Sequence, residues 1–156
     1  ADAVREGRLE ARIGCVISDV ADAFILERAR RAGVPAFHVA PGPSRTRLEG
    51  AAAERVVALL LEHGVTMVAL AGFMRIIKKD LLEAFPGRII NIHPSLLPSF
   101  PGLQAWKQAL EYGVRITGCT VHYVDAGVDT GRIILQRAVP VMPDDTPESL
   151  HARIQA

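Results

Sequence analysis

Cysteine is scarce in this chain of 156 residues, which contains only Cys15 and Cys119. Both lie in apolar, strand-like runs, and neither belongs to a Cys-x-x-Cys pair or to a Cys/His ligand spacing. Two isolated thiols exclude the disulfide framework of small secreted domains and offer no zinc site. We therefore expect two buried free thiols in a reducing cytoplasm, and no metal.

An excess of charge of either sign is also absent. The 18 Lys and Arg residues oppose 17 Asp and Glu residues, which leaves a net charge of +1. A nearly neutral chain has no electrostatic basis for binding nucleic acid or an anionic membrane, so any anion site must be local. No apolar run approaches the roughly 20 residues of a membrane span, and the first residues form no signal peptide. We expect a cytoplasmic protein with neither a nucleic-acid nor a membrane partner.

Both ends of the sequence interrupt a helix. Residues 2–7 are typical of the last turns of a helix that ends at Gly7, yet neither a helix start nor an initiator Met precedes them. Thr146 and Pro147 begin another helix as N-cap and first residue, and the sequence stops inside it. With 49% hydrophobic content, this length predicts one core. We expect a single domain over residues 1–156, truncated at both ends.

Apolar runs alternate with helical patterns along the chain. Unbroken apolar runs predict strands, while apolar residues spaced three and four apart predict helices. The expected strands are 12–18, 36–40, 67–71, 88–92, 117–124 and 132–141, and the expected helices are 21–32, 48–63, 78–85 and 103–112. The last two strands are joined without a helix and should pair antiparallel. The pattern predicts an α/β protein with a three-layer α/β/α, Rossmann-like fold, mostly parallel, with an antiparallel strand near its C-terminal side.

The stretch richest in chemistry is Asn-Ile-His-Pro-Ser-Leu-Leu-Pro, residues 91–98. β-Branched residues mark the end of a buried strand here, and the following prolines prevent a regular element. Asn91 and His93 are two residues apart on an extended backbone, so their side chains point to the same face. They lie where α/β sheets bind ligands, at the carboxyl end of a strand. Either residue alone would be interpreted as a structural turn residue, whereas the pair predicts a functional site.

A second polar stretch, residues 125–131, holds two Asp and two Gly residues between the last two strands. A solvated turn is the first interpretation of such a loop taken alone, and a calcium loop is the alternative. Its acidic positions do not match the twelve-residue calcium pattern, and no acidic residue closes the loop at the required place. The loop therefore gives little support to a metal site.

The two stretches resemble the phosphoribosylglycinamide formyltransferase family, and the resemblance covers essentially the whole chain. It is also carried by residues 21–29, 67–77, 100–103 (Phe-Pro-Gly-Leu), 118–125 (Gly-Cys-Thr-Val-His-Tyr-Val-Asp) and 133–136. Residues 91–98 are similar in all folate-dependent formyltransferases of this fold, whereas residues 100–103 and 118–122 are more particular to the purine enzyme. The resemblance implies transfer of a formyl group from 10-formyltetrahydrofolate to the amine of glycinamide ribonucleotide in purine biosynthesis.

By that resemblance Asn91, His93 and Asp129 form the catalytic set. Formyl transfer passes through a tetrahedral oxyanion, for which the Asn91 amide and protonated His93 can supply hydrogen bonds. His93 also serves as the general acid toward the leaving folate nitrogen, and Asp129 orients His93 and keeps it protonated near neutral pH. Ser95 lacks the context of a nucleophile and is interpreted as structural.

The resemblance further implies a mostly apolar slot for the pterin of the folate. Its expected residues are Leu70, Met74, Arg75, Ile76, Ile77, Val124, Asp125, Ala126 and Val128. Core packing is the competing interpretation for Met74 and Ile76 taken alone. Arg47, or else Arg45, is assigned to the glutamate tail of the folate, with a solvated loop charge as the equal alternative. The ribonucleotide contacts are assigned to Gly72, Ile92, Pro94 and Gly102.

Two positions depart from the family pattern, which usually has His at Gln104 and Pro at Arg132. The phosphate loop of the family would precede Ala1, so binding of the ribonucleotide phosphate is implied by the resemblance and not by any residue of this sequence.

Two alternative functions stay open: a sibling enzyme that hydrolyses formyltetrahydrofolate or formylates methionyl-tRNA, and a folate-binding module without catalysis. The sequence also leaves open a monomer or a homodimer.

Overall fold

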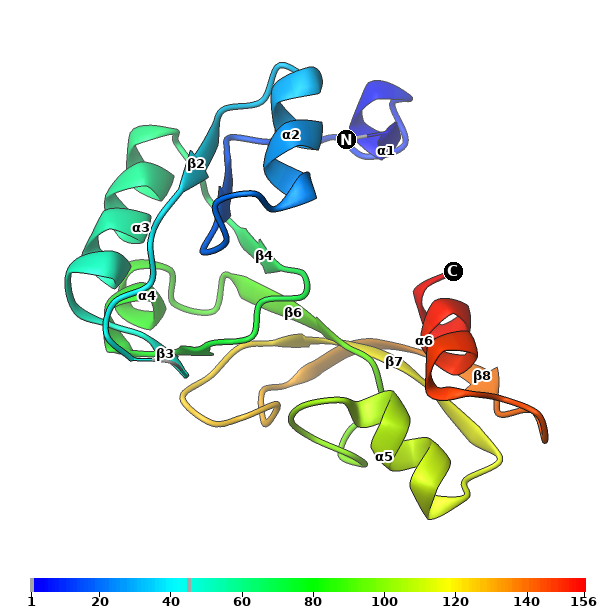
Figure 1. Cartoon of the computed structure of the whole chain (residues 1–156). Coiled ribbons are helices and arrows are strands. Elements are labelled where there is room, and N and C mark those ends of the chain that lie inside the picture. The colour runs from blue at the N-terminus through cyan, green and yellow to red at the C-terminus, as the bar shows by residue number, and fades with distance from the viewer. Residues whose placement is uncertain (1, 45) are drawn as a thin grey trace. The chain divides into compact units, whose positions relative to one another are not determined.

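The computed structural model describes residues 2–44 and 46–156 (Figure 1). These residues group into two compact units. The first unit comprises the chain up to Thr66 together with Lys78–Ala84, and the second comprises Met67–Ile77 and Phe85–Ala156. Asn91, His93 and Asp129 all belong to the second unit, so one unit contains the whole predicted catalytic set.

The first unit is built around a pair of parallel strands. Its elements are α1 (Asp2–Arg5), β1 (Val16–Ser18), α2 (Phe24–Arg31), β2 (Ala36–His38), β3 (Arg47–Leu48), α3 (Gly50–Glu62) and α4 (Lys79–Ala84). β1 and β2 pair in parallel, and α2 connects them and contacts both. α2 buries Leu26 and Ala29, which are three residues apart and therefore share one helix face. α3 contacts α4 in the same unit.

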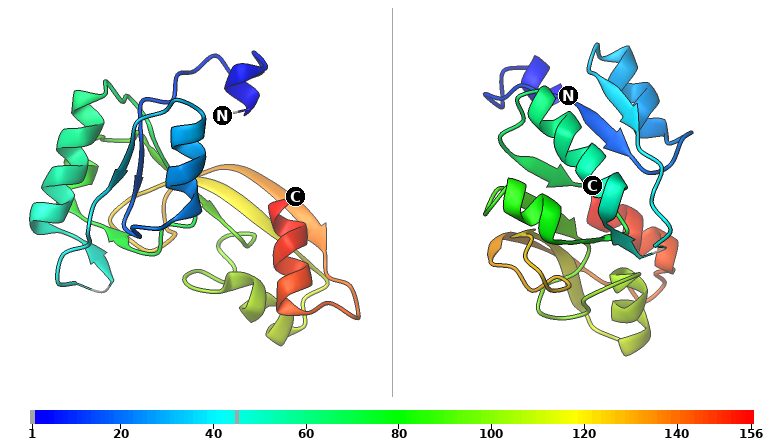
Figure 2. Two further views of the ribbon diagram at one scale, coloured as in Figure 1. Left: turned by 45° about the horizontal axis from the view of Figure 1, so that its top comes forward. Right: turned by 90° about the vertical axis from the view of Figure 1, so that its left-hand side faces the viewer.

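The second unit contains a four-stranded mixed sheet. Its elements are β4 (Val68–Leu70), β5 (Ile76–Ile77), β6 (Ile89–His93), α5 (Ala105–Tyr112), β7 (Ile116–Tyr123), β8 (Ile133–Pro140) and α6 (Pro147–Gln155). The strand order is β4-β6-β7-β8, and Figure 2 shows β7 and β8 in yellow and orange as its two longest strands. β4 and β6 are parallel, whereas β6–β7 and β7–β8 are antiparallel. Gly118 permits the β7–β8 pairing, because a Cβ there would overlap the Arg137 carbonyl oxygen.

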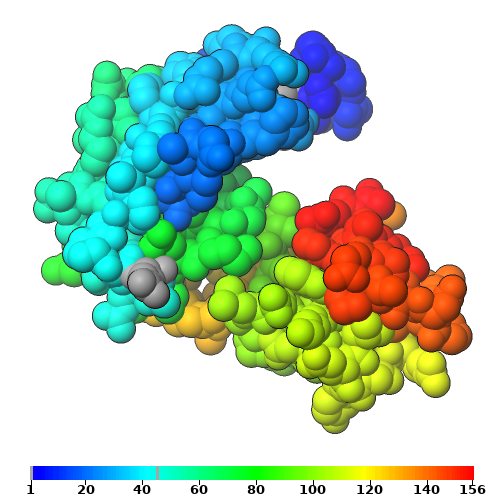
Figure 3. Space-filling view, viewed as in Figure 1, coloured from blue at the N-terminus to red at the C-terminus, as the bar shows by residue number. Residues whose placement is uncertain are grey.

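The two helices of the second unit pack against each other, as the adjoining green and red surfaces in Figure 3 show. The ring of Trp106 in α5 stacks on that of His151 in α6, with centroids 3.8 Å apart and planes 9° from parallel. α6 begins as predicted at Thr146, whose hydroxyl accepts the Ser149 N–H in a capping box. Leu150 is fully buried beyond this cap and anchors the helix.

The predicted alternation of strands and helices is confirmed, with elements shorter than predicted at most ends. Three details differ. β6 runs through His93, one residue past the predicted end, so His93 lies within the strand together with Asn91. The β7–β8 pair is antiparallel as predicted, but the β6–β7 pair is antiparallel too, so the sheet has more antiparallel pairing than predicted. The two-residue strands β3 and β5 were not predicted, because two residues carry no period.

Cys15 and Cys119 are both free, as predicted, but each is half-buried and not fully buried. Burial raises the pKa of the Cys15 thiol above its ordinary value, so this thiol stays protonated near neutral pH. In the part of the chain that the structure describes, no helix combines the length and the apolar character needed to cross a membrane.

Candidate active site

β6 is a central strand that presents Asn91 and His93 on one face. Asn91 lies opposite Leu70 of β4 and His122 of β7, and His93 lies opposite Thr120 of β7. The intervening Ile92 is 52% exposed, whereas His93 is 4% exposed. Asn91 and His93 therefore share one face of the strand, as the alternation of side chains along an extended backbone predicted.

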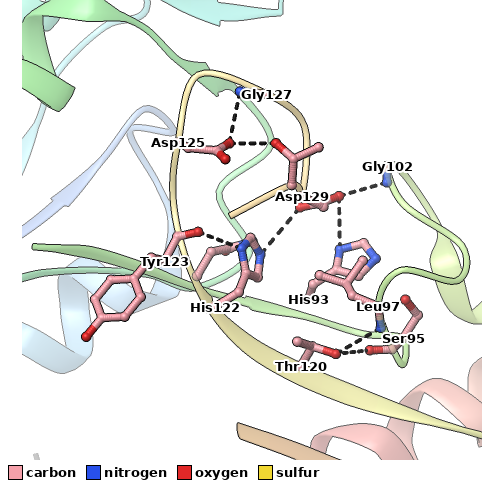
Figure 4. A network of polar contacts seen from close by, with 12 residues as sticks. His93, Ser95, Leu97, Gly102, Thr120, His122, Tyr123, Asp125, Gly127 and Asp129 are labelled. Atoms are coloured by element: carbon pink, nitrogen blue, oxygen red, sulfur yellow. Dashed lines mark hydrogen bonds and ion pairs between the residues drawn. The ribbon is translucent and has the colours of Figure 1, made fainter. Parts of the chain in front are cut away.

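Asp129 lies between two buried histidines (Figure 4). Its Oδ2 is 3.3 Å from His93 Nδ1, and its Oδ1 is 3.6 Å from His122 Nε2. The Gly102 N–H donates to the same Oδ2 at 2.8 Å. The side chain is only 12% exposed, so its charge acts in a site largely shielded from water. Residues from β6, β7 and the loop before α5 therefore converge on one carboxylate of the β7–β8 connection.

The connection between β7 and β8 holds Asp129 in an unusual backbone conformation. Its φ is 54°, in the left-handed region that Asp tolerates better than most residues. Asp125 shapes the same loop by accepting hydrogen bonds from the Gly127 N–H at 3.0 Å and from the Thr130 hydroxyl at 2.6 Å. The Gly127 position is crowded by Thr130, so a Cβ there would overlap its hydroxyl. Asp125 thus organises the turn that carries Asp129.

Hydrogen-bond partners indicate where the protons of His93 lie. Its Nε2 is 2.9 Å from the carbonyl oxygen of Phe100, which can only accept, so Nε2 carries a hydrogen. Its Nδ1 faces Asp129 Oδ2, which is also an acceptor. Two ring nitrogens that both face acceptor oxygens suit a protonated imidazolium. These contacts are compatible with the proton-donor role expected of His93, which stays a prediction.

His122 takes the opposite arrangement and was not among the predicted site residues. Its Nδ1 donates to the Tyr123 carbonyl at 2.9 Å, which leaves Nε2 to accept from the Asn91 amide at 3.3 Å. This contact orients the Asn91 side chain, and the second amide hydrogen remains for another acceptor. The signal that could have revealed His122 is its register opposite Asn91, which requires the antiparallel β6–β7 pairing.

The proline-rich loop after β6 is held by a buried hydroxyl. Thr120 Oγ1 donates to the Ser95 carbonyl at 2.7 Å and accepts the Leu97 N–H at 3.0 Å. Both Ser95 and Thr120 are fully buried. The Ser95 hydroxyl donates to the Ser99 carbonyl at 2.5 Å, which agrees with the structural role predicted for Ser95. The loop is therefore fixed by side chains as well as by its prolines.

The residues expected to bind folate occupy different environments. Leu70 lies beside Asn91 through the β4–β6 pairing, and Met74 and Val128 are 64% and 48% exposed. Ile77 is 3% exposed and belongs to the core. Arg47 lies in β3 of the first unit, and Arg45 lies outside the described residues. The folate contacts, including those of Arg75, Ile76, Val124, Asp125 and Ala126, stay predictions.

The residues expected to bind the ribonucleotide also vary in availability. Gly102 donates its N–H to Asp129 and so helps to position that carboxylate. Ile92 is exposed on the face of β6 away from His93, and Pro94, the residue after His93, is half-buried. Gly72 has a φ of 64°. These contacts also stay predictions.

Comparison with known proteins gives the family. A family model described as formyl transferase matches residues 1–156. The chain belongs to the formyl transferase family. It is 42% identical to the phosphoribosylglycinamide formyltransferase of Bacillus subtilis, over 97% of this chain and 76% of that protein. It is also 47% identical to the trifunctional purine biosynthetic protein adenosine-3 of Drosophila pseudoobscura pseudoobscura, over 98% of this chain but 11% of that longer protein.

The solved structures agree with this assignment. Glycinamide ribonucleotide transformylase 1 from Symbiobacterium toebii matches with a TM-score of 0.92 and 57% identity, over 98% of this chain and 71% of that one. This similarity confirms the predicted α/β formyltransferase fold.

Proposed function

We propose that the protein carrying this chain transfers a formyl group from 10-formyltetrahydrofolate to the amine of glycinamide ribonucleotide. The observation that carries the proposal is the meeting of Asn91, His93 and Asp129 at one buried site, from segments separated in the sequence. The names of the similar proteins specify the reaction class. Both substrates are small molecules, and the chemistry of these three groups requires no metal.

The amine nitrogen attacks the formyl carbon and turns the carbonyl oxygen into an oxyanion. The free hydrogen of the Asn91 amide, whose other hydrogen bonds His122, can donate to this oxyanion. The side chain needs little reorganisation during the reaction, because His122 already fixes it.

Collapse of the tetrahedral intermediate breaks the bond between the formyl carbon and the folate nitrogen. His93 is the proton donor for this leaving nitrogen, and the negative charge of Asp129 at 3.3 Å stabilises the cationic ring before transfer. The amine loses one proton and the folate nitrogen gains one, so the overall reaction is balanced. No covalent enzyme intermediate is needed.

The pterin would lie against the end of β4 and the 124–128 segment, where Leu70 neighbours Asn91. Such a slot is mostly apolar, as a flat heterocycle requires. We assign a cytoplasmic location and a monomer or homodimer to the whole protein.

The test is an assay of the intact protein with both substrates, in which mass spectrometry identifies the acceptor product. We expect formylated glycinamide ribonucleotide and stoichiometric tetrahydrofolate. His93→Asn should abolish most turnover, whereas His38→Asn, the same change at an exposed histidine of the first unit, should not. Release of free formate without the formylated ribonucleotide would instead assign a hydrolase, and no loss of the formyl group at all would refute the proposal.

A further inference from the structure

Gln136 on the edge strand β8 reaches across to the loop that follows the catalytic strand. Its Nε2 donates to the Leu97 carbonyl at 2.9 Å and to Thr120 Oγ1 at 3.0 Å. Gln136 lies opposite Thr120 in the β7–β8 register, so the strand pairing sets the second contact. The first contact joins residues 39 apart in the sequence. The amide therefore bonds to the proline loop and its supporting hydroxyl, although Gln136 is itself exposed.

These donations fix the direction of the Thr120 hydroxyl. Its oxygen accepts from Gln136 and from the Leu97 N–H, which uses both acceptor positions, and its single hydrogen points to the Ser95 carbonyl. Removal of the Gln136 donor leaves one acceptor position of this buried oxygen unfilled and so weakens the set of contacts that holds Thr120 against the loop. The buried Leu97 carbonyl would lose a partner in the same step.

The next contacts lead from Ser95 to the catalytic histidine. The Ser95 hydroxyl donates to the Ser99 carbonyl at 2.5 Å and lies 3.3 Å from the Phe100 carbonyl. The Phe100 carbonyl accepts from His93 Nε2 at 2.9 Å. This carbonyl places a hydrogen on Nε2 and so sets the orientation of the ring. Phe100 adopts a left-handed φ of 55°, which its surroundings must maintain.

We propose that Gln136 is a positioning residue that acts on His93 through the proline loop. It holds Leu97 and Thr120 so that the Phe100 carbonyl stays within hydrogen-bonding distance of His93 Nε2. The inference rests on the proposed role of His93 as the proton donor. It assigns Gln136 no contact with either substrate, so its effect should fall on turnover and not on substrate binding.

The test compares Gln136→Met, which keeps the length of the side chain and removes its donors, with Arg137→Met. Arg137 is the next residue of β8, and its side chain points to the opposite face. Small misplacements of a catalytic group cost up to about 10²-fold in rate. We expect kcat of the intact protein to fall about ten-fold in Gln136→Met, with both KM values within about two-fold, and neither to change in Arg137→Met.

The ¹⁵N NMR signal of His93 Nε2 gives a second readout that a purely structural role would not move. We expect it to shift in Gln136→Met and to stay in place in Arg137→Met, with both proteins fully folded by circular dichroism. Equal turnover in the two variants, or a folded Gln136→Met protein with an unchanged His93 signal, would overturn the inference. If the wild-type protein transfers no formyl group, the proposed function fails separately, and the His93 signal alone decides whether Gln136 positions the ring.

Discussion

Asp129→Asn removes the charge that faces both buried histidines while it keeps the size of the side chain. An amide oxygen at the position of Oδ2 would still accept the Gly102 N–H and face His93 Nδ1, so the loop should keep its conformation. The loss would be the negative charge next to a cationic ring. The catalytic step should therefore suffer more than the fold.

The new amide nitrogen would take the place of Oδ1, which is 3.6 Å from His122 Nε2. That nitrogen already accepts from the Asn91 amide at 3.3 Å. Two donors would then compete for one acceptor, and the orientation of Asn91 would loosen. The substitution is expected to weaken the proton donor directly and the oxyanion donor indirectly.

General acid catalysis by a positioned side chain contributes about 10² to 10⁴-fold. We expect Asp129→Asn to lower kcat at least about 10²-fold, because the proposed proton donor would lose the carboxylate that lies 3.3 Å from its ring. The assay is a pH–rate profile of the intact protein with both substrates saturating. Asp144→Asn, the same change at an exposed position, is the matched control.

Rates of Asp129→Asn that lie within about three-fold of those of Asp144→Asn at every pH would refute this reasoning. Asp129 would then be a residue of a tight turn, and the proton donor would have to be sought elsewhere. Circular dichroism of both variants would exclude misfolding as the cause of any loss.

Asn91→Ala removes the proposed oxyanion donor, so kcat should fall about 10² to 10³-fold with little change in the thermal midpoint; near-normal turnover in the same assay would exclude that role. Thr117→Val should raise the free energy of unfolding in urea by about 1 kcal/mol, because the buried Thr117 hydroxyl has no hydrogen-bond partner among residues 2–44 and 46–156; a decrease would contradict this. The Arg153 guanidinium donates to both Asp145 carboxylate oxygens and holds the pKa of Asp145 well below its usual range. A carboxyl group whose pKa is lowered in the folded state stabilises the fold at pH values above its ordinary pKa and loses this effect as the pH falls. Asp145→Asn should therefore destabilise the protein near pH 7, and the difference in unfolding free energy should shrink below about pH 4 in urea titrations. A difference that stays constant with pH would refute the pairing.

Local rules predicted the part of the site that depends on local geometry. Asn91 and His93 share a face because alternation along an extended strand needs no knowledge of the partner strands. The end of that strand was placed one residue early. β6 continues through His93 because β7 pairs with it up to Thr120, and only then does Pro94, which has no N–H, stop the ladder.

The supporting contacts could not be predicted from sequence, because they depend on register and on backbone groups. His122 reaches Asn91 only through the antiparallel pairing of β6 with β7. The Phe100 carbonyl has no sequence signature, since every residue carries one. Gln136 meets Leu97 only after β8 has paired with β7 and the proline loop has folded back.

The two histidines around Asp129 show how such backbone groups divide the chemistry. Both are almost fully buried, at 4% exposure for His93 and 2% for His122, and both face the same carboxylate. The Tyr123 carbonyl takes the proton of His122 at Nδ1, so the nitrogen that faces Asp129 is an acceptor and serves Asn91. The Phe100 carbonyl takes a hydrogen of His93 at Nε2, so the other ring nitrogen, Nδ1, is the one that faces Asp129 Oδ2 at 3.3 Å. Asp129 therefore lies closer to His93 than to His122, and the carbonyl next to each ring fits the proposed division between a proton donor at His93 and an orienting role for His122.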